Sequence, residues 1–431
     1  MIPRNVSTSF AVSLLAATVA LVPTTGSAAP HSGVAAAAAT SPTHFALSSF
    51  GYGTRVLGGD VPAGSDRSAY QVIGCTDLAG LDKENFEADV DLRPLATASA
   101  VRTHTWTTQR NGVVSSWASN RIAQVQIGDA SAPGTVVLRG IESVSRAYHD
   151  GSGFHSTTQR QVGSITIDPD GSGPIAARQL ALPTAGDPLL VPGVLKISLG
   201  PVRKHADRAG AFATADALVV EVLATTSKIY LAHSHAAIHN GVFSGLFRGS
   251  SYGSRISAAD AALRSRMTPF TLMPCQGTNG KIKGKDIARV NPDGVVLQGL
   301  SAHERSDQTE SGAYGWERGR VANIDVGNGS IVATGIVGKA NVEYVRGRAD
   351  AVTTSTAGTT IGSLSINGET RTFPRTDVLN VPGVAKLERD IVSRTANGIS
   401  VTALRVTLLD GSGAVIDLGR AKVSFGVVRG L

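Results

Sequence analysis

Three histidines that lie close together in the sequence, His233, His235 and His239, have side chains that can bind a metal ion. On a strand, His233 and His235 project from the same face, because side chains alternate between the two faces. Imidazole nitrogens are common zinc ligands, but no carboxylate stands close in the sequence to complete or orient such a site. The pattern therefore allows a metal site, with surface or hydrogen-bonded histidines as the alternative.

Ser251 lies in the segment Gly249–Gly253, which matches the G-x-S-x-G spelling of a nucleophile elbow. That motif needs a sharp turn from a strand into a helix, with a histidine and an acid downstream. The segment around Ser251 reads as a strand, so we interpret the match as a coincidence of spelling. Because no convincing catalytic motif occurs elsewhere, we expect a protein without enzymatic activity and without a cofactor.

Two aromatic pairs recur at nearly the same spacing: Trp117 and Trp316 are 199 positions apart, and Tyr52 and Tyr252 are 200 positions apart. Aromatic side chains on an exposed β face can stack on sugar rings or anchor a protein partner. The alternative is that both tryptophans are core residues, because large aromatic side chains are buried on average. These four residues are the binding candidates, and a cell-envelope glycan or a protein is the expected kind of partner.

The only two cysteines, Cys75 and Cys275, also recur at that spacing. A disulfide between them is expected in an oxidising compartment. Two equivalent positions near a pseudo-two-fold axis face each other, which allows the Cα separation that a disulfide needs. The alternative is two buried free thiols.

The N-terminus predicts export. Arg4 precedes an uncharged run, 10–22, and small residues that end at Ala28 and Ala29, the pattern of a signal peptide over 1–28. A flexible Ala/Ser/Thr spacer is expected over 29–44. No second long apolar segment follows, so we expect a secreted, extracellular protein without a transmembrane segment after cleavage. The net charge of +7 is spread over 431 residues without a basic stripe, which argues against nucleic-acid binding.

The chain contains an internal duplication, repeat one over 45–242 and repeat two over 243–431. Short matches keep their order through both halves, which chance similarity does not do. The matching segments are Gly51–Val56 with Ser251–Ile256, Arg121–Ala123 with Arg320–Ala322, Gly163–Ile167 with Gly362–Ile366, and Val191–Val194 with Val381–Val384.

Apolar residues alternate with polar ones in both repeats, as in Ala123, Val125 and Ile127, which is typical of half-buried strands. Asn367-Gly368 follows such a strand and is a strong hairpin signal. We therefore predict an all-β protein of two tandem β-sandwich-like units. A single β-structure shared by both repeats is the alternative.

The repeated segments resemble the choice-of-anchor P family, exported bacterial β-proteins of unknown function. The resemblance rests on the strand and turn Ser363–Gly368, the Val381–Gly383 loop and the strand Val401–Leu408, with the same series in repeat one. It implies an envelope-associated protein and supplies no catalytic residues. The expected function is binding or a structural role; an exported hydrolase with a dispersed site and a metal-binding exported protein are the alternatives.

Overall fold

The computed structural model describes residues 39–58, 67–93, 95–128, 134–169, 171, 177–257, 267–291, 295–348, 351–374, 376–409, 411 and 413–428. The predicted signal peptide, 1–28, lies outside these residues. The predicted spacer does not extend to residue 44, because the first strand begins at Ser41 and pairs there with Ala79.

Repeat one consists of two antiparallel sheets. Sheet 1A contains, in spatial order, β10 (Leu189–Val191), β11 (Leu195–Leu199), β13 (Gly210–Val222), β14 (Ser227–His239), β1 (Ser41–Leu57) and β2 (Gln71–Ala79), with β12 (Val202–Ala206) also pairing with β13. Sheet 1B contains β3 (Asp82–Leu92), β4 (Ala96–Arg110), β5 (Val113–Ile127), β6 (Thr135–His149), β8 (Ser164–Asp168) and β9 (Arg178–Leu180), with β7 (Phe154–Gln161) also pairing with β6.

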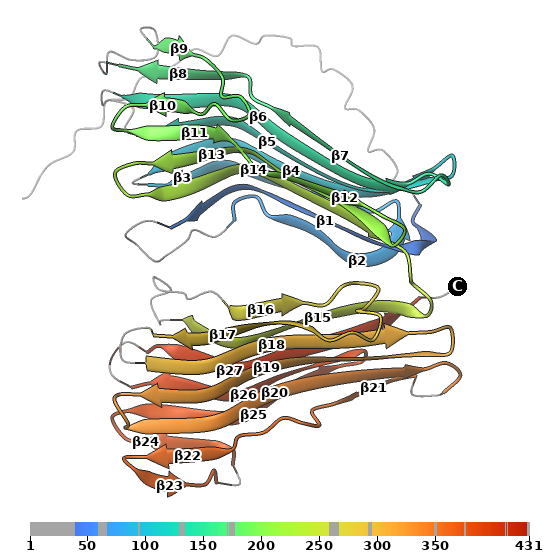
Figure 1. Ribbon diagram of the computed structural model, residues 1–431, viewed down its shortest axis with the longest axis vertical. Coiled ribbons are helices and arrows are strands. Elements are labelled where there is room, and N and C mark those ends of the chain that lie inside the picture. The colour runs from blue at the N-terminus through green and yellow to red at the C-terminus, as the bar shows by residue number, and fades with distance from the viewer. Residues whose placement is uncertain are drawn as a thin grey trace, which may run out of the picture. The chain divides into compact units, whose positions relative to one another are not determined.

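Repeat two has the same arrangement (Figure 1). Sheet 2A contains β16 (Thr268–Leu272), β15 (Gly245–Ser257), β27 (Val415–Val427), β26 (Gly398–Leu408), β25 (Ala385–Thr395) and β24 (Val378–Val381). Sheet 2B contains β17 (Lys283–Val290), β18 (Val295–Gln308), β19 (Gly312–Val326), β20 (Ile331–Val345), β22 (Ser363–Ile366) and β23 (Glu369–Arg371), with β21 (Val352–Ser355) pairing with β20. The all-β prediction is confirmed, and each repeat builds its sheets from its own strands.

The two sheets of each repeat enclose a shared apolar core. In repeat one, Val101 and Ile122 of sheet 1B belong to one buried cluster with Leu218 and Leu231 of sheet 1A. Repeat two has an equivalent cluster of buried side chains from sheets 2A and 2B. Burying apolar side chains between two sheets is the dominant stabilising term of such a sandwich.

A transverse row of irregular residues divides the long strands of each sheet. In sheet 1B, Ala100 has φ +48° and Gly140 has φ +64°, and β4, β5 and β6 lose their regular pairing at this row. The inward-facing residues therefore switch from even to odd positions as each of these strands crosses the row. In β5, Ile122 is buried before the row and Val125 after it, and Ala123, at the row, is exposed. The prediction that Ala123 faces inward is wrong for this reason. The strands curve along their length (Figure 1).

The same row recurs in the other sheets, but the two repeats use different residues at it. Ala100 of β4 and Ala232 of β14 have positive φ in repeat one, whereas the equivalent positions of repeat two are Gly299 and Gly419. A left-handed conformation disfavours a residue with a Cβ and suits glycine. At these two positions repeat one therefore carries backbone strain that repeat two avoids, although Asp390 of β25 has φ +51° at the same row of sheet 2A.

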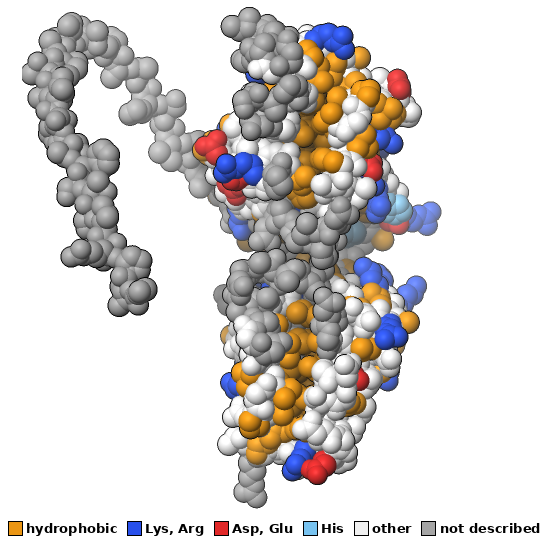
Figure 2. Space-filling model, turned by 90° about the vertical axis from the view of Figure 1, so that its left-hand side faces the viewer, with side chains coloured by type: hydrophobic (Ala, Val, Ile, Leu, Met, Phe, Trp, Pro, Cys, Tyr) orange, Lys and Arg blue, Asp and Glu red, His pale blue; other side chains and the backbone are white. Residues whose placement is uncertain are grey.

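The exposed surface is mixed in character. On the face drawn in Figure 2, apolar side chains gather over both repeats while lysines and arginines are scattered around them. This face shows no continuous basic stripe of the kind that nucleic-acid binding uses. Among the described residues, no helix is long and apolar enough to cross a membrane.

Candidate functional site

The three predicted metal ligands lie along β14 of sheet 1A, and two of them, His233 and His235, have hydrogen-bond partners within the protein. His233 Nδ1 is 2.8 Å from Asp216 Oδ1, and His235 Nδ1 is 2.7 Å from Thr214 Oγ1. Burial, together with the smaller effects of the neighbouring His233 and His239, lowers the pKa of His235 to about 4. No group of three His, Cys, Asp or Glu side chains able to hold a metal ion occurs among the described residues.

Both tyrosines of the predicted binding set are buried, each 4% exposed. The ring of Tyr52 stacks on His233 at 4.4 Å between centroids, and burial raises the pKa of Tyr52 to about 12. Strand pairing places Arg420 opposite Tyr252, as His233 is opposite Tyr52. The residue of repeat two that is equivalent to His233 is therefore Arg420. Stacking on a ligand requires a ring on an exposed face, and neither tyrosine has one.

Trp117 and Trp316 are half-buried and lie on the outer faces of sheets 1B and 2B, not in the cores. In repeat one, Trp117 belongs to a stack of side chains that crosses four strands. The stacked pairs are His104–Trp106 at 4.3 Å, Trp106–Trp117 at 5.2 Å and Tyr148–His155 at 4.8 Å, with the Arg146 guanidinium 4.5 Å from Trp117 and 4.0 Å from Tyr148. Because the ring faces are turned toward one another, this stack stiffens the sheet and leaves its inner rings no free face for a ligand.

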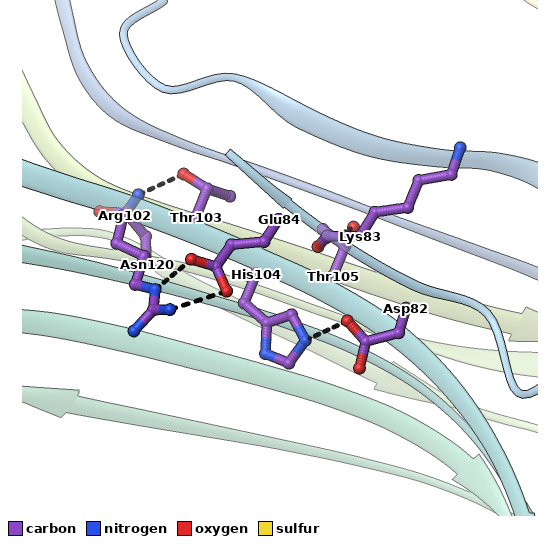
Figure 3. A network of polar contacts seen from close by, with 8 residues as sticks. All are labelled: Asp82, Lys83, Glu84, Arg102, Thr103, His104, Thr105 and Asn120. Atoms are coloured by element: carbon purple, nitrogen blue, oxygen red, sulfur yellow. Dashed lines mark hydrogen bonds and ion pairs between the residues drawn. The ribbon is translucent and has the colours of Figure 1, made fainter. Parts of the chain in front are cut away.

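One end of this stack is fixed by charged groups of β3 and β4 (Figure 3). His104 Nε2 is 2.8 Å from Asp82 Oδ1, and the guanidinium of Arg102 donates to both carboxylate oxygens of Glu84. These side chains are largely exposed, so their ion pairs contribute little to stability. They orient the end of the stack.

The other end of the stack opens into a groove that the sequence did not reveal. A hollow of about 580 Å³ lies between the turn after β6 and the turn after β12, and a second hollow of about 460 Å³ adjoins it. The two hollows share Phe154 and Ala206 in their linings and therefore adjoin there; we call the pair of hollows the groove. Tyr148 and His155, the last members of the stack, line the second hollow.

The floor of the first hollow is aromatic. Phe45 of β1 is 4.9 Å from His149 and 5.7 Å from Phe154 between ring centroids, and His149 and Phe154 meet edge to face at 4.8 Å. Phe45 and Phe154 also pack against a buried apolar cluster, which fixes their positions. These residues belong to β1, β6 and β7. Pairing of β6 with β7 places His149 beside Phe154, and packing of the two sheets places Phe45 against both.

The rim of the groove carries polar and charged side chains from the two turns. Ser152, which donates a hydrogen bond to the neighbouring Asp150, stands on one side, and Asp207, Arg208 and Asn240 stand on the other. A hydrogen bond from Ser152 lowers the pKa of Asp150, and one from His205 lowers the pKa of Asp207. Both carboxylates are therefore ionised at neutral pH and act as hydrogen-bond acceptors.

Asp150, Ser152 and His155 are close enough to suggest a hydrolytic triad, but their geometry does not fit one. His155 Nε2 is 3.1 Å from Asp150 Oδ1 and 3.2 Å from Ser152 Oγ, while Ser152 Oγ also donates to Asp150 Oδ1 at 2.7 Å. A catalytic histidine uses one ring nitrogen for the serine and the other for the acid. Here one nitrogen faces both, and the backbone N–H of Ser152 also donates to Asp150, as in an Asx-turn.

Repeat two fills the equivalent end of its sandwich. Strand pairing equates His149 with Tyr344 and Phe154 with Val352. Tyr344 is buried and stacks on Phe425 at 5.4 Å, within a larger apolar cluster. The groove is therefore a property of repeat one.

Ser251 lies within β15 and is fully buried, which agrees with the interpretation that its motif is a coincidence. Its hydroxyl is 2.8 Å from Thr271 Oγ1 and lies beside Glu317. Glu317 and Glu304 are directly opposite each other on β19 and β18, with exposed fractions of 0% and 3%. Burial raises the pKa of Glu317 well above its usual value, and the charge of Glu304 raises it further. The sequence analysis did not single out this acid pair.

Cys75 and Cys275 form a disulfide with a Cα separation of 5.4 Å, as predicted. The bond links repeat one to repeat two inside a small apolar cluster that includes Ala46 and Leu246. The guanidinium of Arg248 donates to the carbonyl oxygen of Cys75 at 2.6 Å. The two repeats are thus covalently joined at equivalent positions.

No family model matches this chain, and no curated protein matches it.

Proposed function

We propose that this is an exported, non-catalytic β-protein that binds an extended glycan of the cell envelope in the groove of repeat one. The observation that carries the proposal is the pair of adjoining open hollows, the first of which has an aromatic floor and a polar rim. The proposal includes the resemblance to the choice-of-anchor P family, whose members are exported.

The lining of the groove suits sugar rings. The C–H faces of a pyranose pack on aromatic rings, here Phe45 and Phe154, while hydroxyl groups exchange hydrogen bonds with Asp207, Arg208 and Asn240. An enclosed pocket that buries most of a small ligand is the usual arrangement for a metabolite. An open groove with two lobes favours a chain that passes through it.

The lowered pKa values of two carboxyl groups at the groove, Asp150 and Asp207, favour binding over hydrolysis. Glycoside hydrolysis needs one carboxyl group that is still protonated near neutral pH. The pKa values of Asp150 and Asp207 are both lowered, so neither carboxyl group holds a proton there. The disulfide supports the exported setting, because such bonds persist in oxidising compartments.

The test is co-sedimentation of the purified protein with insoluble cell-wall material at low and at high salt. Retention at high salt is expected, because salt screens the attraction between exposed charges but does not remove the packing of sugar rings on aromatic side chains. Phe154→Ala removes part of the floor, and His149→Tyr fills the hollow with the side chain that repeat two has at Tyr344. Each is expected to weaken retention by about fivefold or more, in line with the loss of one aromatic contact.

Val352→Ala is the matched control, because Val352 occupies the position of Phe154 in repeat two. It is expected to leave retention unchanged, and thermal melting establishes that each variant is folded. Wild-type protein that is not retained at high salt would refute glycan binding. Folded Phe154→Ala and His149→Tyr proteins that are retained like the wild type would refute the groove as its site.

A further inference from the structure

Three cationic side chains gather around two aromatic rings on the outer face of sheet 2B. Lys339 Nζ is 5.2 Å and Arg318 Cζ 5.5 Å from the ring centroid of Trp316, and Arg305 Cζ is 5.6 Å from that of Tyr314. The strand register sets this arrangement, because Arg305 pairs with Trp316 and Arg318 pairs with Lys339 on adjacent strands. We call Arg305, Arg318 and Lys339 the cation cluster.

The cation cluster lacks anionic partners within the part of the chain that the structure describes. None of its three members forms an ion pair with a carboxylate there; the nearby Asp286 instead lies 3.5 Å from His303. The Nε atoms of Arg305 and Arg318 are buried and have no hydrogen-bond partner. These buried Nε atoms are out of reach of a ligand, and Arg318 Nη2 lies 3.3 Å from His303 Nδ1. The capacity of the cluster for an anion therefore rests on its cationic heads, whose charge no carboxylate of the described residues neutralises by an ion pair.

The fold itself does not require these cations. The same face of repeat one has Trp106, Ser119 and Val144 at the positions of Arg305, Arg318 and Lys339. Both repeats keep a tryptophan at the centre, Trp117 or Trp316. At these three positions the positive charge is specific to repeat two; repeat one instead packs a single cation, Arg146, on its central tryptophan.

We propose that the cation cluster is a binding site for a tetrahedral oxyanion, the phosphate or sulfate group of an anionic ligand. A guanidinium presents paired N–H donors that match two oxygens of such a group, and an ammonium adds a point charge beside them. Packing on Trp316 and Tyr314 holds the cationic heads in place before the ligand arrives, which reduces the entropy lost on binding. This site is independent of the glycan groove of repeat one.

The experiment is isothermal titration calorimetry of the full chain with inorganic phosphate, inorganic sulfate and linear polyphosphate as separate probes. The test variant is Arg318→Gln/Lys339→Gln, with Lys339→Gln alone in case the double variant does not fold. Arg121→Gln/Arg203→Gln is the matched control, because it removes the same charge from exposed positions of repeat one. Binding to the test variant is expected to be about tenfold weaker or more, and binding to the control within about twofold of the wild type.

The probes distinguish the source of the anion. Binding of free phosphate or sulfate would support a site for a single oxyanion, and binding of polyphosphate alone would support recognition of a phosphate-rich polymer. The proposal is overturned if no probe binds. It is equally overturned if the test and control variants lose affinity to the same extent, because the attraction would then follow net charge alone.

Discussion

The buried pair Glu304 and Glu317 makes a specific prediction about stability and pH. The two carboxyl groups face each other inside the sandwich, and oxygens of both lack hydrogen-bond partners of ordinary geometry. The groups around them are the hydroxyls of Ser251 and Thr271 from the facing sheet and the ammonium groups of Lys283 and Lys285 of sheet 2B. Burial raises the pKa of Glu304, and the charges of the two lysines only partly offset this. Two carboxylates this close and this buried cannot both ionise without a large penalty.

The sign of the effect follows from the direction of the pKa shift. Burial and the charge of Glu304 raise the pKa of Glu317 in the folded protein, while the unfolded chain releases its proton near pH 4.3, about the ordinary value. The stability that this group contributes is therefore present below the unfolded pKa and is lost as the pH rises toward the folded pKa. Over that interval the free energy of unfolding falls by about 1.4 kcal/mol per pH unit.

Glu317→Gln keeps the size of the neutral acid and cannot ionise. We expect its unfolding free energy to match the wild type near pH 4 and to exceed it increasingly above pH 5, by about 1.4 kcal/mol per unit. Glu304→Thr/Glu317→Ala installs the residues that repeat one has at these positions, Thr105 and Ala118, and should remove the same pH dependence. Urea unfolding from pH 4 to pH 9, followed by tryptophan fluorescence and circular dichroism, measures both.

A parallel pH profile for the wild type and Glu317→Gln would refute the reasoning, because it would mean that the pair holds no extra proton in the folded state. Thr105→Ser in repeat one is the control for substitution at the equivalent buried position, and it should leave the slope unchanged.

Two further predictions concern the backbone and the cross-link. Ala100→Gly and Ala232→Gly are each expected to raise the free energy of unfolding by up to about 1 kcal/mol, because glycine accepts the positive φ without strain. The reverse change at the equivalent glycines of repeat two, Gly299 and Gly419, should lower it. Urea unfolding measures both changes, and glycine variants that are less stable than the wild type would contradict the strain. Cys75→Ser/Cys275→Ser opens a loop of sequence separation 200 and should lower the free energy of unfolding by at most about 5 kcal/mol. Thermal melting of this variant beside oxidised wild type measures the change, and an unaltered midpoint would show that the bond does not restrain the unfolded chain.

The sequence predicted the repeat architecture well because each repeat samples the same pattern of alternating residues. Strand existence, the all-β class and the boundary near residue 242 follow from local periodicity, and the linker between β14 and β15 lies at 240–244. The disulfide was predictable because Cys75 and Cys275 are equivalent and have no competitors. The inward-facing parity was not fully predictable, since a residue such as Ala100 gives no local sign that it adopts a left-handed conformation.

The candidate sites were determined mainly by tertiary structure. His233 and His235 have the spacing of metal ligands, but their ring nitrogens are hydrogen-bonded to Asp216 and Thr214, which come from a different strand. Trp117 was singled out by its type as a binding candidate, and only the folded sheet shows that stacked neighbours cover the faces of its ring.

By itself, then, the sequence determined two β-sandwich repeats joined through their cysteines, because periodicity and duplication are local and repeated signals. The groove brings together Phe45, Phe154 and Asp207, which are far apart in the chain, and the acid pair depends on Glu304 lying opposite Glu317. Strand register decides both, and register is a property of the packed sheets, in which a shift of one residue would turn every one of these side chains to the other face.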